Sequence, residues 1–372
     1  MKKLLAVLLV LTLVMTMVTG CGKASDDKKE PTTAPTAAVE PTTAPTDAPA
    51  TEPTTETPDA TADAAKTGFA IVPSIAKSTD ATADADGLAE VDSLIAAVIV
   101  DKDGKIVDCQ IDAEMTKMNF SVEGKLTTDV ATTFKTKQEL GEEYGMKSAS
   151  GIGKEWYEQA NAFAAYVVGK TVDEVKGIAV NEEGLAGDAD LAASITVHIG
   201  SFIAVVEKAV NNAQELGATT ADQVGFAATI DMAKSTDATA DAAGLAQSYA
   251  NYAVVTVGAD GKITSCIIDA AQGNINFGTD GKVTTDLATV IKTKQELKEE
   301  YGMKAASGIG KEWYEQANAF AAYVTGKSVD EVTGIALSDE GKAADADLAA
   351  SVTVHIGPFM ANVAKAVANA AK

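Results

Sequence analysis

The two histidines of this 372-residue sequence are its first candidates for chemistry, because histidine is the side chain that changes charge near neutral pH. His198 and His355 each stand in a Ser-x-Thr-Val-His-Ile-Gly string. In a strand over residues 194–199, Thr196 would share a face with His198, and Thr353 has the same spacing from His355. Such a face can hydrogen-bond a ligand, or it can belong to a satisfied, half-buried histidine. Neither histidine lies in a Cys/His cluster, so no metal site is expected.

A glycine-rich loop, Ser-Ala-Ser-Gly-Ile-Gly-Lys at 148–154, leads directly into a predicted helix. Its glycines would expose N–H groups at the positive end of the helix dipole, where an anion can bind. The loop is not a P-loop, since Ser148 stands where the first glycine belongs and Glu155 follows the lysine. A plain helix N-cap explains the loop equally well. The candidate binding residues are Ser150, Gly151 and Gly153, with Ser307, Gly308 and Gly310 in a second copy.

Two further polar patterns have a structural explanation. Asp80, Asp84 and Asp86 suggest a calcium loop, but the spacing differs from an EF-hand and no glutamate closes it, which favours a solvated acidic turn. Cys109 and Cys266 occupy the same place in two repeats, which favours two buried thiols over a disulfide.

An internal repeat organises the chain. Ser78 begins the string Ser-Thr-Asp-Ala-Thr-Ala-Asp, which recurs from Ser235 at an offset of 157 residues (235 minus 78). The cysteines, tryptophans and histidines recur at the same offset, so no insertion intervenes. The sequence therefore predicts two near-identical modules of ordinary domain size, at 68–217 and 225–372.

Strands and helices are segregated within each module, which predicts an α+β fold. Alternation around the turn Asp-Lys-Asp-Gly at 101–104 predicts a β-hairpin over 94–111. After Lys135 the apolar period becomes helical. The other expected elements are a short hairpin over 119–127, a helix from Trp156 that Gly169 ends, a short helix capped by Thr171, a strand over 194–199 and a helix with Ser201 as its N-cap.

The first residues resemble an export signal, with lysines followed by an apolar run. We expect a signal peptide over 1–20, and the Val-Thr-Gly-Cys ending resembles a lipobox that would make Cys21 the lipidated first residue of the mature protein. An ordinary signal with a chance cysteine is the alternative. Residues 21–67 are rich in Thr and Pro, and this composition predicts a disordered stalk on the membrane surface.

The charge of the chain excludes one class of partner. Its formal net charge is −23, and every one of its 30 basic residues is lysine. An acidic protein of this kind is not expected to bind nucleic acid. Without arginine there is no bidentate clamp for a phosphate, so a phosphate site must use backbone N–H groups or lysine.

One string in each module resembles a known family. Gly-Ile-Gly-Lys-Glu-Trp-Tyr-Glu-Gln at 151–159, together with the Asp-Gly-Lys hairpins, resembles major membrane immunogen-like surface lipoproteins of Gram-positive bacteria, which are related to FMN-binding domains. In such domains Asp-x-x-Ser/Thr-Gly-Ala-Thr precedes the last helix, and its threonine carries the flavin through a phosphoester. The matching segment here runs from Asp190 to Thr196, and it keeps the Asp-to-Thr spacing but lacks Gly-Ala.

The resemblance implies a membrane-anchored, extracytoplasmic protein that binds FMN and passes electrons to a redox partner at the cell surface. Thr196, Thr353 and the two histidines would then contact the flavin. This would make the chain an electron carrier rather than an enzyme with its own substrate. The competing hypothesis is a non-catalytic surface binding or structural protein that keeps the fold without flavin.

Overall fold

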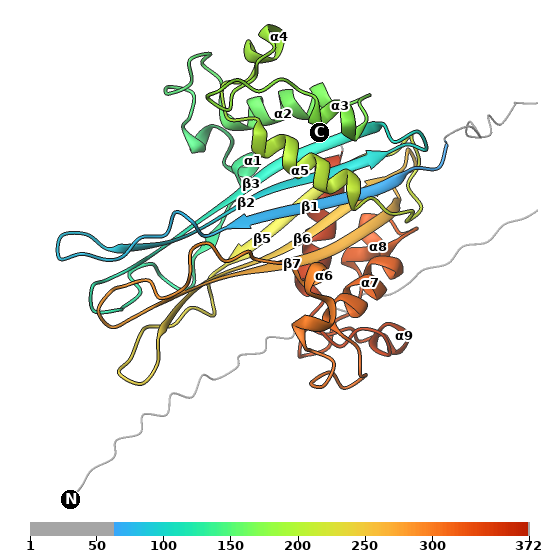
Figure 1. Ribbon diagram of the computed structural model, residues 1–372. Coiled ribbons are helices and arrows are strands. Elements are labelled where there is room, and N and C mark those ends of the chain that lie inside the picture. The colour runs from blue at the N-terminus through green and yellow to red at the C-terminus, as the bar shows by residue number, and fades with distance from the viewer. Residues whose placement is uncertain (1–62, 371–372) are drawn as a thin grey trace, which may run out of the picture. The chain divides into compact units, whose positions relative to one another are not determined.

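The computed structural model describes residues 63–370 and has a mixed α+β fold (Figure 1). The predicted signal peptide, Cys21 and the stalk as far as residue 62 lie outside the described residues. β1 (Lys66–Ser74) begins two residues before the expected start of the first module. Within the described part of the chain, no helix is long and apolar enough to cross a membrane.

The first sheet is antiparallel, in the order β1-β2-β3. β2 (Gly87–Val100) and β3 (Ile106–Phe120) form the predicted hairpin, although the strands are longer than expected. The turn is closed by Asp101, whose Oδ1 accepts the N–H groups of Asp103 and Lys105. A carboxylate that bonds its own turn in this way is the reason why Asp is favoured at such positions.

The second sheet contains β5 (Gln223–Asp231), β6 (Gly244–Val257) and β7 (Ile263–Phe277), each 157 residues after its counterpart (223 minus 66, 244 minus 87, 263 minus 106). β4 (Thr133–Phe134), from the first half of the chain, pairs with β5, so the second sheet has the order β4-β5-β6-β7. The two halves therefore share backbone hydrogen bonds.

Helices follow the hairpin in both halves. The predicted helix from Trp156 is confirmed as α2 (Trp156–Val167). Glu155 and Glu158 form a capping box at its N-terminus. Thr171 caps the short helix α3 as expected. The remaining helical elements are α1 (Lys137–Leu140), η1 (Gly141–Tyr144), α3 (Val172–Lys176), α4 (Ala189–Ala192), α5 (Gly200–Asn211), α6 (Lys294–Leu297), η2 (Lys298–Tyr301), α7 (Trp313–Val324), α8 (Val329–Thr333), α9 (Ala346–Ala349) and α10 (Gly357–Ala370).

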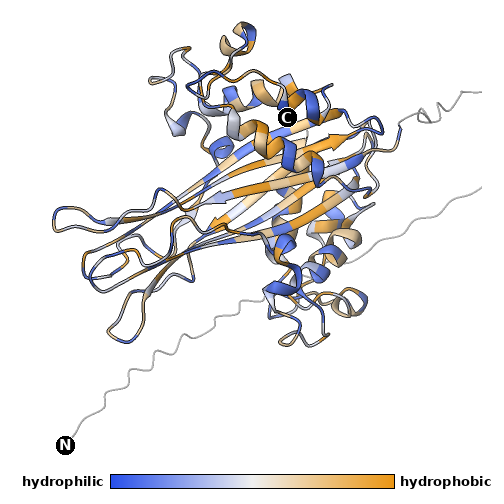
Figure 2. Cartoon of the chain, in the orientation of Figure 1, coloured by the Kyte–Doolittle hydropathy of each residue, from blue (hydrophilic) through white to orange (hydrophobic). Residues whose placement is uncertain are grey.

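Each sheet is buried on both faces. One face of the first sheet packs against α2 and α5, and one face of the second packs against α7 and α10. The other two faces pack on each other around Phe69, Phe226 and Tyr252. Figure 2 shows the resulting concentration of apolar residues along the central strands. This double burial explains why 94–100 reads as an almost continuous apolar run.

A second contact joins the two halves at the ends of the long hairpins. Asp80 Oδ1 accepts the N–H of Val283 at 2.8 Å, and Asp237 Oδ1 accepts the N–H of Leu126 at 2.8 Å. The acidic turn, which the sequence predicts to be solvated, therefore makes a hydrogen bond to the other half. No cluster of His, Cys, Asp or Glu suited to a metal ion occurs among residues 63–370.

Two predicted elements differ from the structure. Residues 194–199 do not form a strand, because the side chain of Gln159 takes the backbone N–H groups of Thr196 and Val197 that a strand would donate to a neighbour. Helix α5 accordingly begins at Gly200, with Ile199 rather than Ser201 at its N-cap. The second predicted hairpin keeps its turn but is reduced to a single bridge between Phe120 and Leu126, because β3 itself continues to Phe120.

Candidate functional site

A buried glutamine on α2 brings two of the predicted site segments together. The Gln159 side chain is 0% exposed, and its Oε1 accepts the Thr196 N–H at 2.7 Å and the Thr196 hydroxyl at 3.3 Å. Its Nε2 donates to the Ser150 hydroxyl and to the Lys154 carbonyl, both at 3.2 Å. Because one amide serves both segments, the loop at 148–154 and the segment before α5 are held at a fixed separation.

The second half repeats this arrangement around Gln316. Its Oε1 accepts the Thr353 N–H at 2.8 Å and the Thr353 hydroxyl at 3.1 Å, while its Nε2 donates to Ser307 at 3.1 Å. We call the two arrangements the Gln159 site and the Gln316 site. Sequence reasoning missed both glutamines. The available signal was their place on the buried stripe of the helix, where a polar residue needs partners.

The glycine loop itself is folded as a helix entry. The Ser150 hydroxyl accepts N–H groups of Ile152 and Lys154, both at 3.4 Å. The Glu155 carboxylate accepts the N–H groups of Met146 and Lys147 just before it. A carboxylate already stands at the N-terminus of α2, so this end of the helix is poorly suited to a second anion. Gly151 and Gly153 shape the loop, and Gly153 has a φ of 64°.

The start of α5 is a better place for an anion. No side chain caps this helix, and its N-cap residue Ile199 donates its own N–H to Gly184 at 3.0 Å. Gly200 and Ser201 are exposed, and their N–H groups lie at the positive end of a 12-residue helix. His198 lies next to this turn and is exposed, as is His355, so the interpretation of a half-buried histidine is wrong.

Thr196 and the first turn of α5 are the groups of the Gln159 site that could hold a phosphate. The half-buried Thr196 hydroxyl lies four residues before the uncapped turn that starts at Gly200. If that hydroxyl were esterified, Gln159 Oε1 would keep the N–H groups of Thr196 and Val197. Thr353 has the same position, although Pro358 removes one N–H from the first turn of α10.

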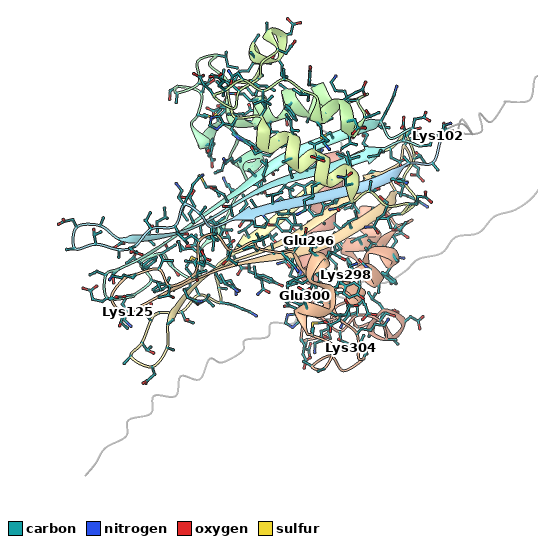
Figure 3. All side chains as sticks on the ribbon, in the orientation of Figure 1. Lys102, Lys125, Glu296, Lys298, Glu300 and Lys304 are labelled. Atoms are coloured by element: carbon teal, nitrogen blue, oxygen red, sulfur yellow. The ribbon has the colours of Figure 1, made fainter. Side chains whose placement is uncertain are left out.

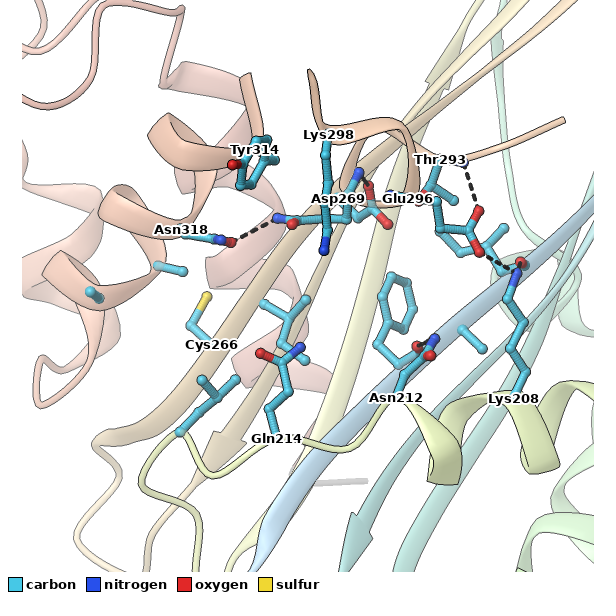
Figure 4. A pocket seen from close by; sticks show the side chains of 18 of the residues that line it. Lys208, Asn212, Gln214, Cys266, Asp269, Thr293, Glu296, Lys298, Tyr314 and Asn318 are labelled. Carbon is cyan, nitrogen blue, oxygen red and sulfur yellow. Dashed lines mark hydrogen bonds and ion pairs between the residues drawn. The ribbon is translucent and has the colours of Figure 1, made fainter. Parts of the chain in front are cut away.

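Two grooves lie where the halves meet, away from the Gln159 and Gln316 sites. We call them the Cys266 groove, with a volume of about 910 Å³, and the Cys109 groove, with about 670 Å³. Both volumes lie in the range of small-molecule sites. The Cys266 groove runs between β1 and α5 of the first half and β7 and α7 of the second (Figure 4). The Cys109 groove runs between β5 and α10 of the second half and β3 and α2 of the first.

The two grooves share a frame of corresponding residues. Gln295 Nε2 donates to the Asn318 side chain at 2.8 Å in the Cys266 groove, and Gln138 makes the same bond to Asn161 in the other. Each frame also contains an ion pair across the halves. These pairs are Lys208 with Glu296 and Lys365 with Glu139.

The grooves differ at the last strand of each half, β3 or β7. In the Cys109 groove, Asp108 accepts the N–H of Val224 at 2.9 Å and Gln110 accepts the N–H of Phe226 at 3.1 Å. The corresponding residues of the second half are Ser265 and Ile267. The Ile267 side chain has no hydrogen-bond acceptor, so the bond that Gln110 makes across the Cys109 groove has no counterpart in the Cys266 groove. The Cys266 groove is the larger of the two.

A buried carboxyl lies at the bottom of each groove. Burial raises the pKa of Asp112 to about 7, although N–H groups of Ala113 and Gln138 donate to its Oδ1. Asp269 has the same surroundings, and burial likewise raises its pKa to about 7. Cys109 and Cys266 are free buried thiols, as predicted, and burial raises the pKa of both. These thiols are poor nucleophiles, because the thiolate is the reactive form.

Lys294 is enclosed by aromatic rings in the second half. Its Nζ lies 4.7 Å from the ring centre of Tyr249, 4.5 Å from that of Tyr301 and 5.0 Å from that of Trp313. Burial lowers the pKa of this lysine to about 8. With only 3% of its surface exposed, the amine holds the packing of three rings rather than facing a ligand.

Comparisons with known proteins add little. No protein-family model matches the sequence, and no solved structure matches the chain. A chlorophenol reductase of Desulfitobacterium hafniense is 51% identical over 43 residues. That stretch is 12% of this chain and 13% of the reductase, so the chain spans only a small part of this curated relative.

Proposed function

We propose that this chain is a membrane-anchored, extracytoplasmic lipoprotein with two tandem FMN-binding-like modules, and that it carries electrons outside the membrane. One observation carries the proposal. The segments that the family resemblance singles out, 151–159 and 190–196, are bonded to each other, because Gln159 at the end of the first accepts the N–H of Thr196 just before α5. Gln316 makes the corresponding bonds to Ser307 and Thr353 in the second half.

The residues of the site act by holding the phosphate end of the cofactor. The N–H groups of the first turn of α5 bind phosphate oxygens, and this replaces the arginine clamp that the sequence lacks. Gln159 fixes the backbone at Thr196 and so fixes the hydroxyl beside that turn. His198 is exposed at the same turn and can donate to the phosphate. A bound flavin would supply the capacity to accept and release electrons.

The test is an absorbance spectrum of the protein purified from its native membrane, recorded before and after denaturation and desalting. We expect visible flavin absorbance that is lost in the Thr196→Ala/Thr353→Ala double variant. The control is Ser194→Ala/Ser351→Ala, which removes a hydroxyl from the same segment and should leave the spectrum unchanged. Absorbance that survives denaturation would indicate covalent attachment. A colourless native protein that also fails to bind added FMN would refute the proposal.

The second candidate is a surface binding protein, and the two grooves favour it. They are lined by corresponding residues and lie between halves that share one folded unit. This function needs no flavin, because neither groove is lined by Thr196 or Thr353. Ligand binding that persists in the colourless Thr196→Ala/Thr353→Ala variant would separate this function from the first.

A further inference from the structure

Lys298 has an unusual backbone. It is the one residue other than glycine with a positive φ among residues 63–370, with φ 48° and ψ −117°. The corresponding residue of the first half is Gly141, with φ 49° and ψ −121°. A side chain in this conformation is strained by contact with its own backbone. The second half therefore keeps a lysine at a position where the fold favours glycine.

The strained lysine lines the Cys266 groove. Figure 4 shows its side chain extending from η2 into the groove, toward Gln214. The side chain is exposed, and its ammonium has no ion pair or hydrogen bond with the described part of the chain. By contrast, Lys208 in the same groove is paired with Glu296 at 2.7 Å. Lys298 thus adds a positive charge to the groove that is in no ion pair, and the carboxylate it interacts with electrostatically is that of its neighbour Glu299.

Neutral polar groups line the groove together with this charge. Gln295 and Asn318 are bonded to each other through one donor and one acceptor, which leaves the Gln295 carbonyl and the Asn318 amino group for a ligand. Gln214 and the half-buried ring of Tyr314 also line the groove. Asp269 is buried and already accepts two backbone N–H groups.

The Cys109 groove lacks this combination. The residue that corresponds to the lysine is Gly141, and Asp108 adds a carboxylate that has no counterpart in the lining of the Cys266 groove. An anion would therefore be attracted to one groove and repelled by the other. The distinction depends on a few side chains on an otherwise shared frame.

We propose that the Cys266 groove binds a small carboxylate-bearing ligand, with Lys298 pairing the carboxylate and the Gln295–Asn318 amides bonding its neutral polar part. One unpaired lysine balances the single negative charge of a carboxylate. A phosphate monoester carries about 1.5 to 2 negative charges, so part of its charge would stay unbalanced in a protein that is already acidic. This proposal goes beyond flavin binding and does not depend on it.

The experiment is calorimetric titration of the Thr196→Ala/Thr353→Ala protein with two matched pairs of probes. N-acetylmuramate and N-acetylglucosamine differ by a carboxylate on a sugar, and N-acetylalanine and N-acetylalaninamide differ by one on an amino acid. We expect at least one carboxylate probe to bind roughly tenfold more tightly than its neutral partner, as one charge-assisted hydrogen bond provides. The pair that shows the preference identifies the ligand as a saccharide or a peptide derivative.

The matched variant is Lys298→Gly, which gives the second half the residue that the first half already has. It should abolish the preference for the carboxylate without lowering the melting temperature, because glycine relieves the backbone strain. Lys304→Ala is the control, since Lys304 is exposed in the same half and does not line the groove (Figure 3). No preference in the parent protein, or an unchanged preference after Lys298→Gly, would overturn the proposal.

Discussion

At the scale of single residues, most of the organisation depends on buried polar side chains whose partners come from distant segments. Gln159 bonds segments on both sides of it in the sequence. Glu114, between the two sheets, accepts hydroxyl groups of Thr116, Ser248 and Tyr252. A buried polar group of this kind contributes little when it is satisfied and costs free energy when it is left unpaired.

We expect Gln159→Leu to destabilise the protein by about 2 to 4 kcal/mol, because the N–H groups of Thr196 and Val197 lose their acceptor. Chemical denaturation measures this change in the free energy of unfolding. Asn161→Ala, on the same helix, removes only an exposed hydrogen bond from Gln138, so it is the control and should change it by less than about 1 kcal/mol. Equal effects of the two substitutions would contradict a linking role for Gln159.

The buried carboxyls predict how stability depends on pH. Burial raises the pKa values of Asp112 and Asp269 from 3.8 to about 7 and also raises the pKa of Glu114. The folded state therefore holds more protons than the unfolded state in this range, and the free energy of unfolding falls as pH rises from 3.8 through 7.

Asp112→Asn/Asp269→Asn should flatten this pH dependence, because Asn does not titrate but keeps the Oδ1 acceptor. Glu114 would leave a slope of the same sign. Urea unfolding across the range measures the slope for both proteins. A stability that rises with pH between these limits would contradict the assignment of neutral buried carboxyls.

At the scale of elements, helices lie unusually close to edge strands. A Cβ added to Gly68 on β1 would lie 2.2 Å from the Ala209 carbonyl oxygen on α5, and Gly225 has the same relation to Ala366 on α10. Lys208 and Asn212 then donate to carbonyls of β1, so α5 also covers the free edge of the sheet. Close approach is what allows these bonds, and it blocks edge-to-edge pairing.

Gly68→Ala should therefore lower stability by about 1 to 3 kcal/mol, since backbone atoms of both elements must move apart. Thermal unfolding followed by circular dichroism measures the loss. Gly151→Ala is a suitable control because its Cβ would meet no atom within 4 Å and its φ is not positive. A loss at Gly151 as large as that at Gly68 would indicate that general glycine effects explain both.

At the scale of the whole folded unit, the two halves depend on each other. The face around Phe69, Ile71 and Ile95 is covered by the face around Phe226 and Tyr252. Backbone pairing of β4 with β5 and the contacts of Asp80 and Asp237 add polar bonds across the halves. The grooves exist only because the halves are packed in this way.

Residues 63–222 produced alone should self-associate, because the separated half exposes an apolar sheet face. Adding separately produced residues 223–372 should restore a one-to-one complex. Light scattering coupled to gel filtration measures both states. A first half that stays monomeric and melts at the temperature of the intact protein would show that the halves are independent.

The sequence by itself determined the local structure. Turn chemistry at 101–104 and alternation predicted the hairpin of β2 and β3, and the helical period predicted α2 up to Gly169. Repetition of the cysteines at one offset predicted buried thiols, which the structure confirms. These features depend on residues that are close together in the sequence, so they can be predicted without knowledge of the packing.

Only the tertiary structure decided which segments meet. Period-two alternation cannot show what covers the second face of a strand such as β2, so the packing of sheet on sheet and the grooves beside it were not predictable. The segment 194–199 has the pattern of a strand, yet Gln159 captures its backbone donors. A side chain 37 residues away in sequence overrides the local preference, because a buried amide must satisfy its own hydrogen bonds wherever the fold places it.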